Sequence, residues 1–187
     1  MSNVRAHMSE PVTPEEINTQ RLRLRRPSAA DASALFTAYT QDPLVCRYMI
    51  WAPHKSEAVT LEFVTSCVEA WKVGTRLAYV ITERETNIAI GMIEARMLGT
   101  TVDIGYVLAR MHWGKGLMPE AIQALAAVAL KNPGVFRVHA TCDAENIPSQ
   151  RALEKAGFKC EGRLERYTVH PNISPEPRTC FMYAKCR

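Results

Sequence analysis

Residues 112–121 read HWGKGLMPEA and join an apolar run, residues 104–108, to a helical pattern that extends to Lys131. Two glycines, Gly114 and Gly116, therefore stand where a strand is expected to end and a helix to begin. Glycine at such a junction adopts backbone angles that other residues avoid, or lets a ligand approach the backbone closely. A tight strand-to-helix turn explains two glycines equally well, so the surrounding sequence has to distinguish a binding loop from a simple turn.

Two common nucleotide-binding motifs do not fit this loop. A P-loop needs an earlier glycine and a hydroxyl residue after the lysine, and neither accompanies Lys115. The dinucleotide fingerprint needs a third glycine at the position that Pro119 occupies. A general basis for binding remains, because the first amides of a helix have no intrahelical partner and lie at the positive end of its dipole. The amides of residues 114–118 are thus a candidate cradle for a diphosphate.

The composition is that of an ordinary globular protein. The chain has 187 residues, of which 47% are hydrophobic and 22% charged, so we expect one domain over residues 19–187 after a flexible segment over residues 1–18. The net charge of +4 is mild. Arginines near the start alternate with leucines, which favours a strand with one solvent-facing side over a nucleic-acid surface, although an anionic ligand also suits them. These arginines are Arg21, Arg23, Arg25 and Arg26.

The cysteines and the hydropathy limit the kinds of site and the location that we expect. None of the six cysteines forms a C-x-x-C pair, and no histidine–cysteine group has the spacing of a zinc site. We therefore expect reduced thiols and no bound metal. No apolar run approaches the roughly 20 residues of a membrane helix, and the polar N-terminus lacks the pattern of a secretory signal. The sequence predicts a cytoplasmic protein that binds neither membranes nor nucleic acids.

Helical and strand patterns follow one another in an irregular order. We expect an α+β fold with a mixed, mostly antiparallel sheet of about seven strands flanked by about four helices. Strands over 77–82, 88–95 and 101–108 form the expected antiparallel meander. The other expected elements are an edge strand over 22–26, a helix over 29–39 capped by Ser28, a helix over 56–73 ended by Gly74, a helix from the glycine loop to Lys131, a strand over 135–141, a helix over 149–156, and strands over 158–169 and 179–185.

A second motif, NIPSQRALEKAGF at residues 146–158, follows an expected strand. Helix capping explains Asn146 in this motif, but it does not explain why the motif occurs together with the glycine loop. On the segments TQRLRLRRPSAADASALF (19–36), IGYVLARMHWGKGLMPEAI (104–122) and NIPSQRALEKAGFKCEGRLER (146–166), the chain resembles the GNAT superfamily of acetyl-CoA-dependent N-acetyltransferases. Within that superfamily it is similar to the RimJ/RimL-like branch, which acetylates protein N-termini.

The resemblance implies the GNAT fold, acetyl-CoA as cosubstrate and a set of contacts to it. The glycine loop would hold the CoA pyrophosphate, and the preceding strand would pair with pantetheine and splay from strand 137–142 to leave a gap for the acetyl group. Asn146 would contact pantetheine, and Ser149 would lie near the thioester sulfur. Met111 departs from the arginine or glutamine of the family, which removes a phosphate contact but leaves the backbone cradle. The implied cofactor contacts are Tyr106, Val107, Leu108, Trp113, Gly114, Lys115, Gly116, Leu117, Met118, Asn146 and Ser149.

Acetyl transfer to an amine needs few catalytic groups. An N-terminal amine with a pKa of about 7.8 is neutral far more often than a lysine at about 10.4, so an α-amine asks less of a general base. The candidate bases are Asp103 and Glu94, each in an expected strand. The alternative for each is a solvent-facing strand residue with no catalytic role. Ser149 is a candidate to protonate the leaving thiolate, or is only a first-turn serine. A backbone amide near Val107 or Leu108 is the candidate oxyanion donor.

Three other residues have competing interpretations. Tyr167 either lines the acceptor channel or only packs against neighbours. His54 stands before the second helix on the acceptor side, where it either titrates near neutrality or is an ordinary surface histidine. Cys142 lies near the expected gap, but a nucleophilic cysteine needs a histidine partner that the sequence does not place, so direct transfer is favoured.

Three functions remain open from the sequence. They are acetylation of a protein or peptide N-terminus, acetylation of a small amine such as an aminoglycoside, polyamine or amino-acid analogue, and CoA binding without catalysis. A polycationic acceptor would need a cluster of carboxylates, and no acidic run lies near the expected acceptor loops, 48–56 and 170–177. This favours an N-terminus, while Asn146 and Ser149 argue against a binding-only module. The protein is expected to be a monomer or a homodimer.

Overall fold

The structure is a computed structural model that describes residues 13–187. Residues 1–12 of the flexible segment predicted over residues 1–18 lie outside the described residues. Residues 16–18 form the first strand and pair with the second, so the ordered domain begins before residue 19.

An eight-stranded sheet with strand order β1-β2-β3-β4-β5-β6-β8-β7 forms the centre of the molecule. All neighbouring strands are antiparallel except β5 and β6, and the expected meander is confirmed as β3, β4 and β5. The sheet has one strand more than expected because β1 is too short to show an alternating pattern. Since β1 pairs with β2, the prediction that β2 is an edge strand is wrong. The strands are β1 (Glu16–Asn18), β2 (Leu22–Arg25), β3 (Arg76–Glu83), β4 (Ala89–Leu98), β5 (Thr101–Leu108), β6 (Arg137–Asp143), β7 (Lys159–Val169) and β8 (Pro177–Cys186).

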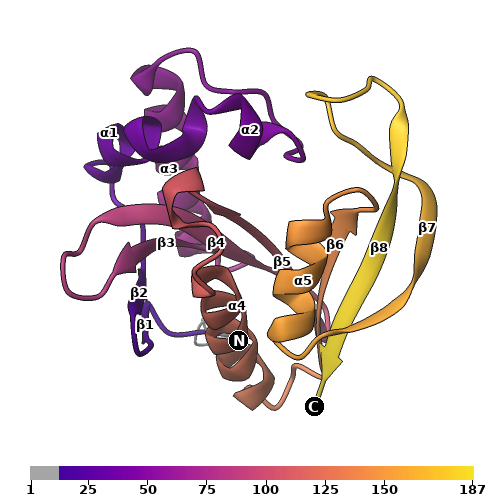
Figure 1. The fold of residues 1–187 in the computed structure, drawn as a ribbon. Coiled ribbons are helices and arrows are strands. Elements are labelled where there is room, and N and C mark those ends of the chain that lie inside the picture. Colours follow the sequence, from indigo (N-terminus) through magenta and orange to yellow (C-terminus); the bar gives the residue numbers. More distant parts are fainter. Residues whose placement is uncertain (1–12) are drawn as a thin grey trace, which may run out of the picture.

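Helices pack against both faces of this sheet (Figure 1). Strand β3 shows the two faces directly, because Leu77, Tyr79 and Ile81 belong to the core under α4 and α5, whereas Ala78 and Val80 belong to the core under α1 and α3. Burial on both sides explains why this strand is almost continuously apolar. The helices are α1 (Asp31–Leu35), the π-helical turn η1 (Phe36–Thr40), α2 (Pro43–Cys46), α3 (Glu57–Val73), the 3-10 turn η2 (Arg110–His112), α4 (Leu117–Lys131) and α5 (Ile147–Lys155).

The first helical region differs from the single helix expected over residues 29–39. Helix α1 is short and widens into η1, and its N-cap is Ala30 rather than Ser28. The Ser28 backbone amide instead donates to the Asp31 carboxylate over 2.7 Å, so the capping carboxylate belongs to the helix itself. The expected end of α3 is confirmed, since Gly74 has a left-handed φ of 77°. Within residues 13–187, no helix has the length and apolar character needed to cross a bilayer.

The sheet opens between β5 and β6. These two strands pair only where Thr101–Asp103 lie beside Arg137–His139. Beyond this point β5 continues to Leu108 and β6 to Asp143 without pairing with each other. The half of the sheet formed by β6, β8 and β7 therefore diverges from the rest (Figure 1). The divergence leaves backbone groups of β5 free to meet a ligand.

Gly91 in β4 permits a close approach to the end of β5. A Cβ atom at Gly91 would lie 2.3 Å from the Val107 carbonyl oxygen and 3.1 Å from the Leu108 Cα. Both neighbours are backbone atoms, so Gly91→Ala must push the strands apart, and we expect the free energy of unfolding to fall by about 3 kcal/mol in urea titrations. Gly162→Ala in β7, where a Cβ meets nothing within 4 Å, is the matched control. Equal losses in the two variants would contradict this interpretation.

Candidate active site

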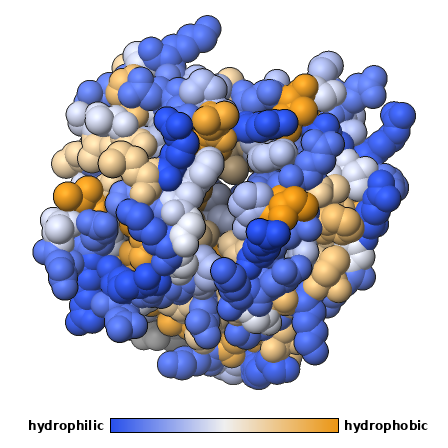
Figure 2. Space-filling model, viewed as in Figure 1, coloured by the Kyte–Doolittle hydropathy of each residue, from blue (hydrophilic) through white to orange (hydrophobic). Residues whose placement is uncertain are grey.

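A cavity of about 470 Å³ occupies the opening between β5 and β6. In the view of Figure 1 the molecular surface is hollowed near its centre (Figure 2). Four of the sequence-predicted cofactor residues line the cavity: Tyr106 and Val107 on β5, and Asn146 and Ser149 at the start of α5. Leu108 ends β5, and Trp113, Gly114, Lys115, Gly116, Leu117 and Met118 form the loop and the first turn of α4 outside the cavity wall.

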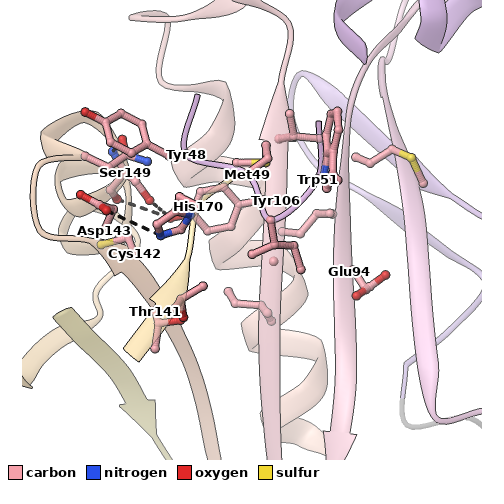
Figure 3. A pocket seen from close by; sticks show the side chains of 18 of the residues that line it. Tyr48, Met49, Trp51, Glu94, Tyr106, Thr141, Cys142, Asp143, Ser149 and His170 are labelled. Carbon is pink, nitrogen blue, oxygen red and sulfur yellow. Dashed lines mark hydrogen bonds and ion pairs between the residues drawn. The ribbon is translucent and has the colours of Figure 1, made fainter. Parts of the chain in front are cut away.

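Two hydroxyl groups meet across the opening. The Tyr106 phenol and the Ser149 Oγ lie 2.7 Å apart (Figure 3). Burial raises the pKa of Tyr106 well above its usual range, so the phenol keeps its proton. The Asn146 Oδ1 accepts a hydrogen bond of 3.3 Å from the Ser149 amide, which confirms the predicted N-cap and fixes the turn that carries the serine. The Ser149 hydroxyl is therefore held between the two diverging parts of the sheet, with a protonated phenol behind it.

The two candidate bases form one row of charges across β3, β4 and β5. The Glu94 carboxylate accepts from Arg76 over 2.5 Å and from Arg96 over 2.8 Å. The Asp103 carboxylate accepts from Arg96 over 2.9 Å, at the part of β5 that still pairs with β6. Glu94 lines the cavity and Asp103 does not. The structure therefore brings these two carboxylates together on Arg96, but only Glu94 lines the cavity.

The opposite side of the cavity carries a histidine and an aspartate that sequence reasoning missed (Figure 3). Asp143 is the last residue of β6, and its side chain is fully buried. Its carboxylate accepts a hydrogen bond of 2.6 Å from the Arg178 Nε. The His170 Nε2 lies 3.6 Å from the same carboxylate, and its buried Nδ1 has no hydrogen-bond partner in residues 13–187. Burial lowers the pKa of His170 although Asp143 opposes the shift, so the ring is neutral at neutral pH. No spacing in the sequence could have found this group, since its members come from three separate strand ends.

One buried histidine, His170, and two partly buried ones, His54 and His139, make acid destabilising for the fold. Burial lowers the pKa of His54, His139 and His170 below the usual 6.5. The unfolded chain therefore binds more protons than the folded one below about pH 6.5, and the free energy of unfolding decreases there. We expect a lower melting temperature at about pH 5.5 than at about pH 7.5, and a smaller difference in His170→Asn. A melting temperature that stays constant or rises toward pH 5.5 would show that these rings gain protons freely in the folded state.

Cys142 lines the cavity without a catalytic partner. Burial raises the pKa of its thiol to about 12. The one histidine of the cavity wall, His170, has its Nε2 3.9 Å from the sulfur of Cys180, not of Cys142. The arrangement therefore agrees with direct transfer rather than with a cysteine nucleophile.

The two predicted acceptor loops close one end of the cavity together. Asn172 donates from its Nδ2 to the carbonyl oxygens of Cys46 and Trp51, over 2.6 and 2.8 Å. The Tyr48 hydroxyl donates to the Glu145 carbonyl over 3.3 Å and so links the first loop to the β6–α5 turn. The two bonds of Asn172 join segments that lie 121 and 126 residues apart in the sequence. This end of the cavity is thus covered by two loops that hydrogen bonds hold in place.

Two residues with competing interpretations lie away from the cavity wall. The His54 Nδ1 bonds to the Thr60 hydroxyl over 2.8 Å, and its ring packs 5.1 Å from Trp51 between centroids. His54 therefore packs within loop 48–56 rather than lining the cavity. Tyr167 is 52% exposed on β7 and is not among the residues that line the cavity either.

The glycine loop has the geometry of an anion cradle. Gly114 and Gly116 both have φ of 74°, a left-handed conformation that favours glycine. Among the described residues, no hydrogen-bond partner is found for the backbone amides of 114–118. Met111, at the position where the resemblance implies arginine or glutamine, is 84% exposed, and neighbouring Arg110 pairs with Asp42. The backbone alone therefore supplies the donors that a diphosphate requires.

Comparison with known proteins places this site in context. The family model described as Acetyltransferase (GNAT) domain matches residues 21–159. The uncharacterized N-acetyltransferase p20 of Bacillus licheniformis is 31% identical over 156 residues, 82% of this chain and 87% of that protein.

Two solved structures share the fold over almost the whole chain. The microcin C7 self-immunity acetyltransferase MccE, in complex with acetyl-CoA and AMP, has a TM-score of 0.83 at 20% identity and covers 95% of this chain and 99% of its own. An acetyltransferase from Salmonella typhimurium that modifies the N-terminal serine of ribosomal protein L7/L12 has a TM-score of 0.81 at 20% identity, with 92% and 99% covered. At these identities the similarity shows a common fold.

Proposed function

The chain belongs to the GNAT family of acetyl-CoA-dependent N-acetyltransferases, and we propose that this member acetylates the N-terminal α-amine of a protein or peptide. The observation that carries the proposal is the charge of the cavity wall. Its carboxylates, Glu94 and Asp143, are each paired with arginine, so the cavity offers no free negative charge to a polycation. An acceptor that presents a single amine suits this wall better than an aminoglycoside or a polyamine does.

The chemistry favours an α-amine for a second reason. Transfer forms a carbon–nitrogen bond at the thioester carbonyl and breaks the carbon–sulfur bond, while the amine loses a proton and the sulfur gains one. An α-amine has a pKa of about 7.8 and is partly neutral at physiological pH, whereas lysines and alkyl polyamines are almost fully protonated. Neutral His170, beside Asp143, and Glu94 are the groups of the wall that can take the remaining proton, directly or through water. Asp103 is the weaker candidate because it does not line the cavity.

Ser149 is the proposed proton donor to the departing sulfur. Its hydroxyl lies 2.7 Å from the Tyr106 phenol, which keeps its own proton and orients the serine by a hydrogen bond. The serine would give its proton to the sulfur and regain one, through water, from the amine that loses it. A backbone amide near Val107 or Leu108, where β5 no longer pairs with β6, is the proposed donor to the carbonyl oxygen.

Cofactor binding is proposed along the free edge of β5 and at the glycine loop. The amides of 114–118 would hold the diphosphate, and the unpaired edge at Tyr106–Leu108 would meet the pantetheine amides. The Asn146 Oδ1 is used by the Ser149 amide, which leaves its Nδ2 to bind pantetheine. Trp113 supports this arrangement by donating 2.7 Å from its indole to the Leu108 carbonyl, which ties the loop to the end of β5.

Label transfer from radioactive acetyl-CoA into a desalted bacterial lysate, compared with the small-molecule fraction, tests the proposed acceptor. Label in protein that disappears when N-termini are blocked, but persists when lysines are blocked, is the expected result. Label found only in the small-molecule fraction would replace the proposal by acetylation of a small amine. Binding of acetyl-CoA without transfer to either fraction would favour a module that binds but does not catalyse.

A further inference from the structure

Arg21 lies in the turn between β1 and β2, yet its side chain reaches the glycine loop 94 residues away. Its Nη1 donates 2.9 Å to the Lys115 carbonyl, and its Nη2 donates 3.2 Å to the Gly116 carbonyl. Its Nε donates 2.7 Å to the carboxylate of Glu120, in the first turn of α4. One guanidinium group thus spans two loop carbonyls and a helix side chain, a geometry that suits its planar fork of donors.

The bonds to the loop carbonyls control where the loop amides point. The described part of the chain has no cis peptide bond, and in a trans peptide the C=O of one residue and the N–H of the next point in opposite directions. Holding the Lys115 carbonyl therefore aims the Gly116 amide away from Arg21, and holding the Gly116 carbonyl does the same for Leu117. Without this support, two left-handed glycines would leave the loop free to sample other conformations, at an entropic cost on binding.

Glu120 brings a negative charge close to the same loop. Its carboxylate accepts 2.6 Å from the Thr19 hydroxyl and 2.9 Å from the Arg21 amide. Burial opposes ionisation, but these hydrogen bonds and Arg21 hold the pKa of Glu120 below its usual range, so it is charged. An uncompensated carboxylate in the first turn would repel a bound diphosphate, and the Arg21 guanidinium, 2.7 Å from it, provides the compensating charge.

We propose that Arg21 is a positioning residue for the cofactor: it holds the loop carbonyls on the side away from the diphosphate and neutralises Glu120 beside it. This inference depends on the proposed role of the glycine loop in binding acetyl-CoA. It assigns a role to one member of the N-terminal arginine group, whose alternation with leucine indicates only a strand. Arg21 itself lies just before β2, where its side chain is directed to α4 rather than to solvent alone.

The test compares Arg21→Gln with Arg23→Gln. Arg23 is the matched control, since it lies two residues later, in β2, and pairs with Glu16 over 2.6 Å rather than with the loop. For Arg21→Gln we expect the KM for acetyl-CoA to rise about tenfold with kcat nearly unchanged, because a charge-assisted brace is lost but no reacting group is. With S-acetylpantetheine, which has no diphosphate, both variants should match the wild type. Arg21→Lys, which keeps the charge but not the fork, should give an intermediate KM.

Three outcomes would overturn the inference. The KM for acetyl-CoA would be unchanged in Arg21→Gln, or it would rise by the same factor with S-acetylpantetheine, which would indicate a general loss of structure. An Arg21→Lys variant equal to the wild type would show that the fork is not needed. Calorimetric titration with CoA separates this failure from that of the proposed function. Wild-type protein that binds no CoA refutes both, whereas equal binding by wild type and Arg21→Gln refutes the role of Arg21 alone.

Discussion

Replacing Ser149 by alanine is expected to lower kcat about 100-fold, the usual contribution of a positioned proton donor. The variant removes the hydroxyl that lies 2.7 Å from the Tyr106 phenol, and with it the path by which a proton reaches the departing sulfur. Binding of CoA should change little, because the backbone donors of the loop and of β5 remain. Initial rates of CoA thiol release at saturating acetyl-CoA measure kcat, and titration with CoA measures binding.

Tyr106→Phe and a matched serine variant complete this test. If Tyr106 and Ser149 act as a unit, the double variant should lose little more than Ser149→Ala alone. Ser66→Ala is the control, since Ser66 is an exposed helical serine whose hydroxyl donates only to the Phe63 carbonyl. Full activity of Ser149→Ala would contradict its assignment as donor and leave it as a residue of the first turn. Additive losses in the double variant would mean that the two hydroxyls act separately.

Gly114→Asp is expected to weaken CoA binding about 100-fold, because the new carboxylate would repel the diphosphate at the loop. Gly114 has φ of 74°, and a Cβ there meets nothing within 4 Å, so the new side chain would occupy the space beside the free amides. Aspartate tolerates the left-handed conformation better than most residues, which limits the backbone strain. The expected damage is therefore to the anion cradle rather than to the fold.

Gly99→Asp provides a close control for this variant. Gly99 lies in the β4–β5 turn with φ of 64°, and a Cβ there also meets nothing within 4 Å. The two variants share the same charge change and similar backbone strain, but only one is at the loop. Isothermal titration with CoA should give a normal dissociation constant for Gly99→Asp. Equal dissociation constants for both variants would place the diphosphate somewhere other than the glycine loop.

The features that the sequence predicted correctly are local ones. The end of α3 at Gly74 and the cap of α5 at Asn146 involve residues within a few positions of each other. The glycine loop is likewise visible because a left-handed conformation favours glycine at each position separately. The meander was predictable because its strands are consecutive, and β1 was not because three residues carry no period.

The features that the sequence missed depend on contacts between distant segments. Alternation places Glu94 and Asp103 in strands, but only the point where β5 and β6 part decides which of them reaches the cavity. The grouping of Asp143 with His170 joins two strand ends that no sequence spacing connects. Arg21 looked like one solvent-facing arginine among four, because its partners lie in the glycine loop and the first turn of α4, 94 to 99 residues later in the sequence.

The most direct test of the proposed activity uses two peptides of identical sequence that contain one lysine. One peptide has a free α-amine and an acetylated lysine, and the other has an acetylated α-amine and a free lysine. Spermidine serves as the small polycationic acceptor, and mass spectrometry after incubation with acetyl-CoA locates the new acetyl group. The account predicts acetylation of the first peptide at its N-terminus, with little change in the second peptide or in spermidine. Efficient acetylation of spermidine, with neither peptide modified, would contradict it.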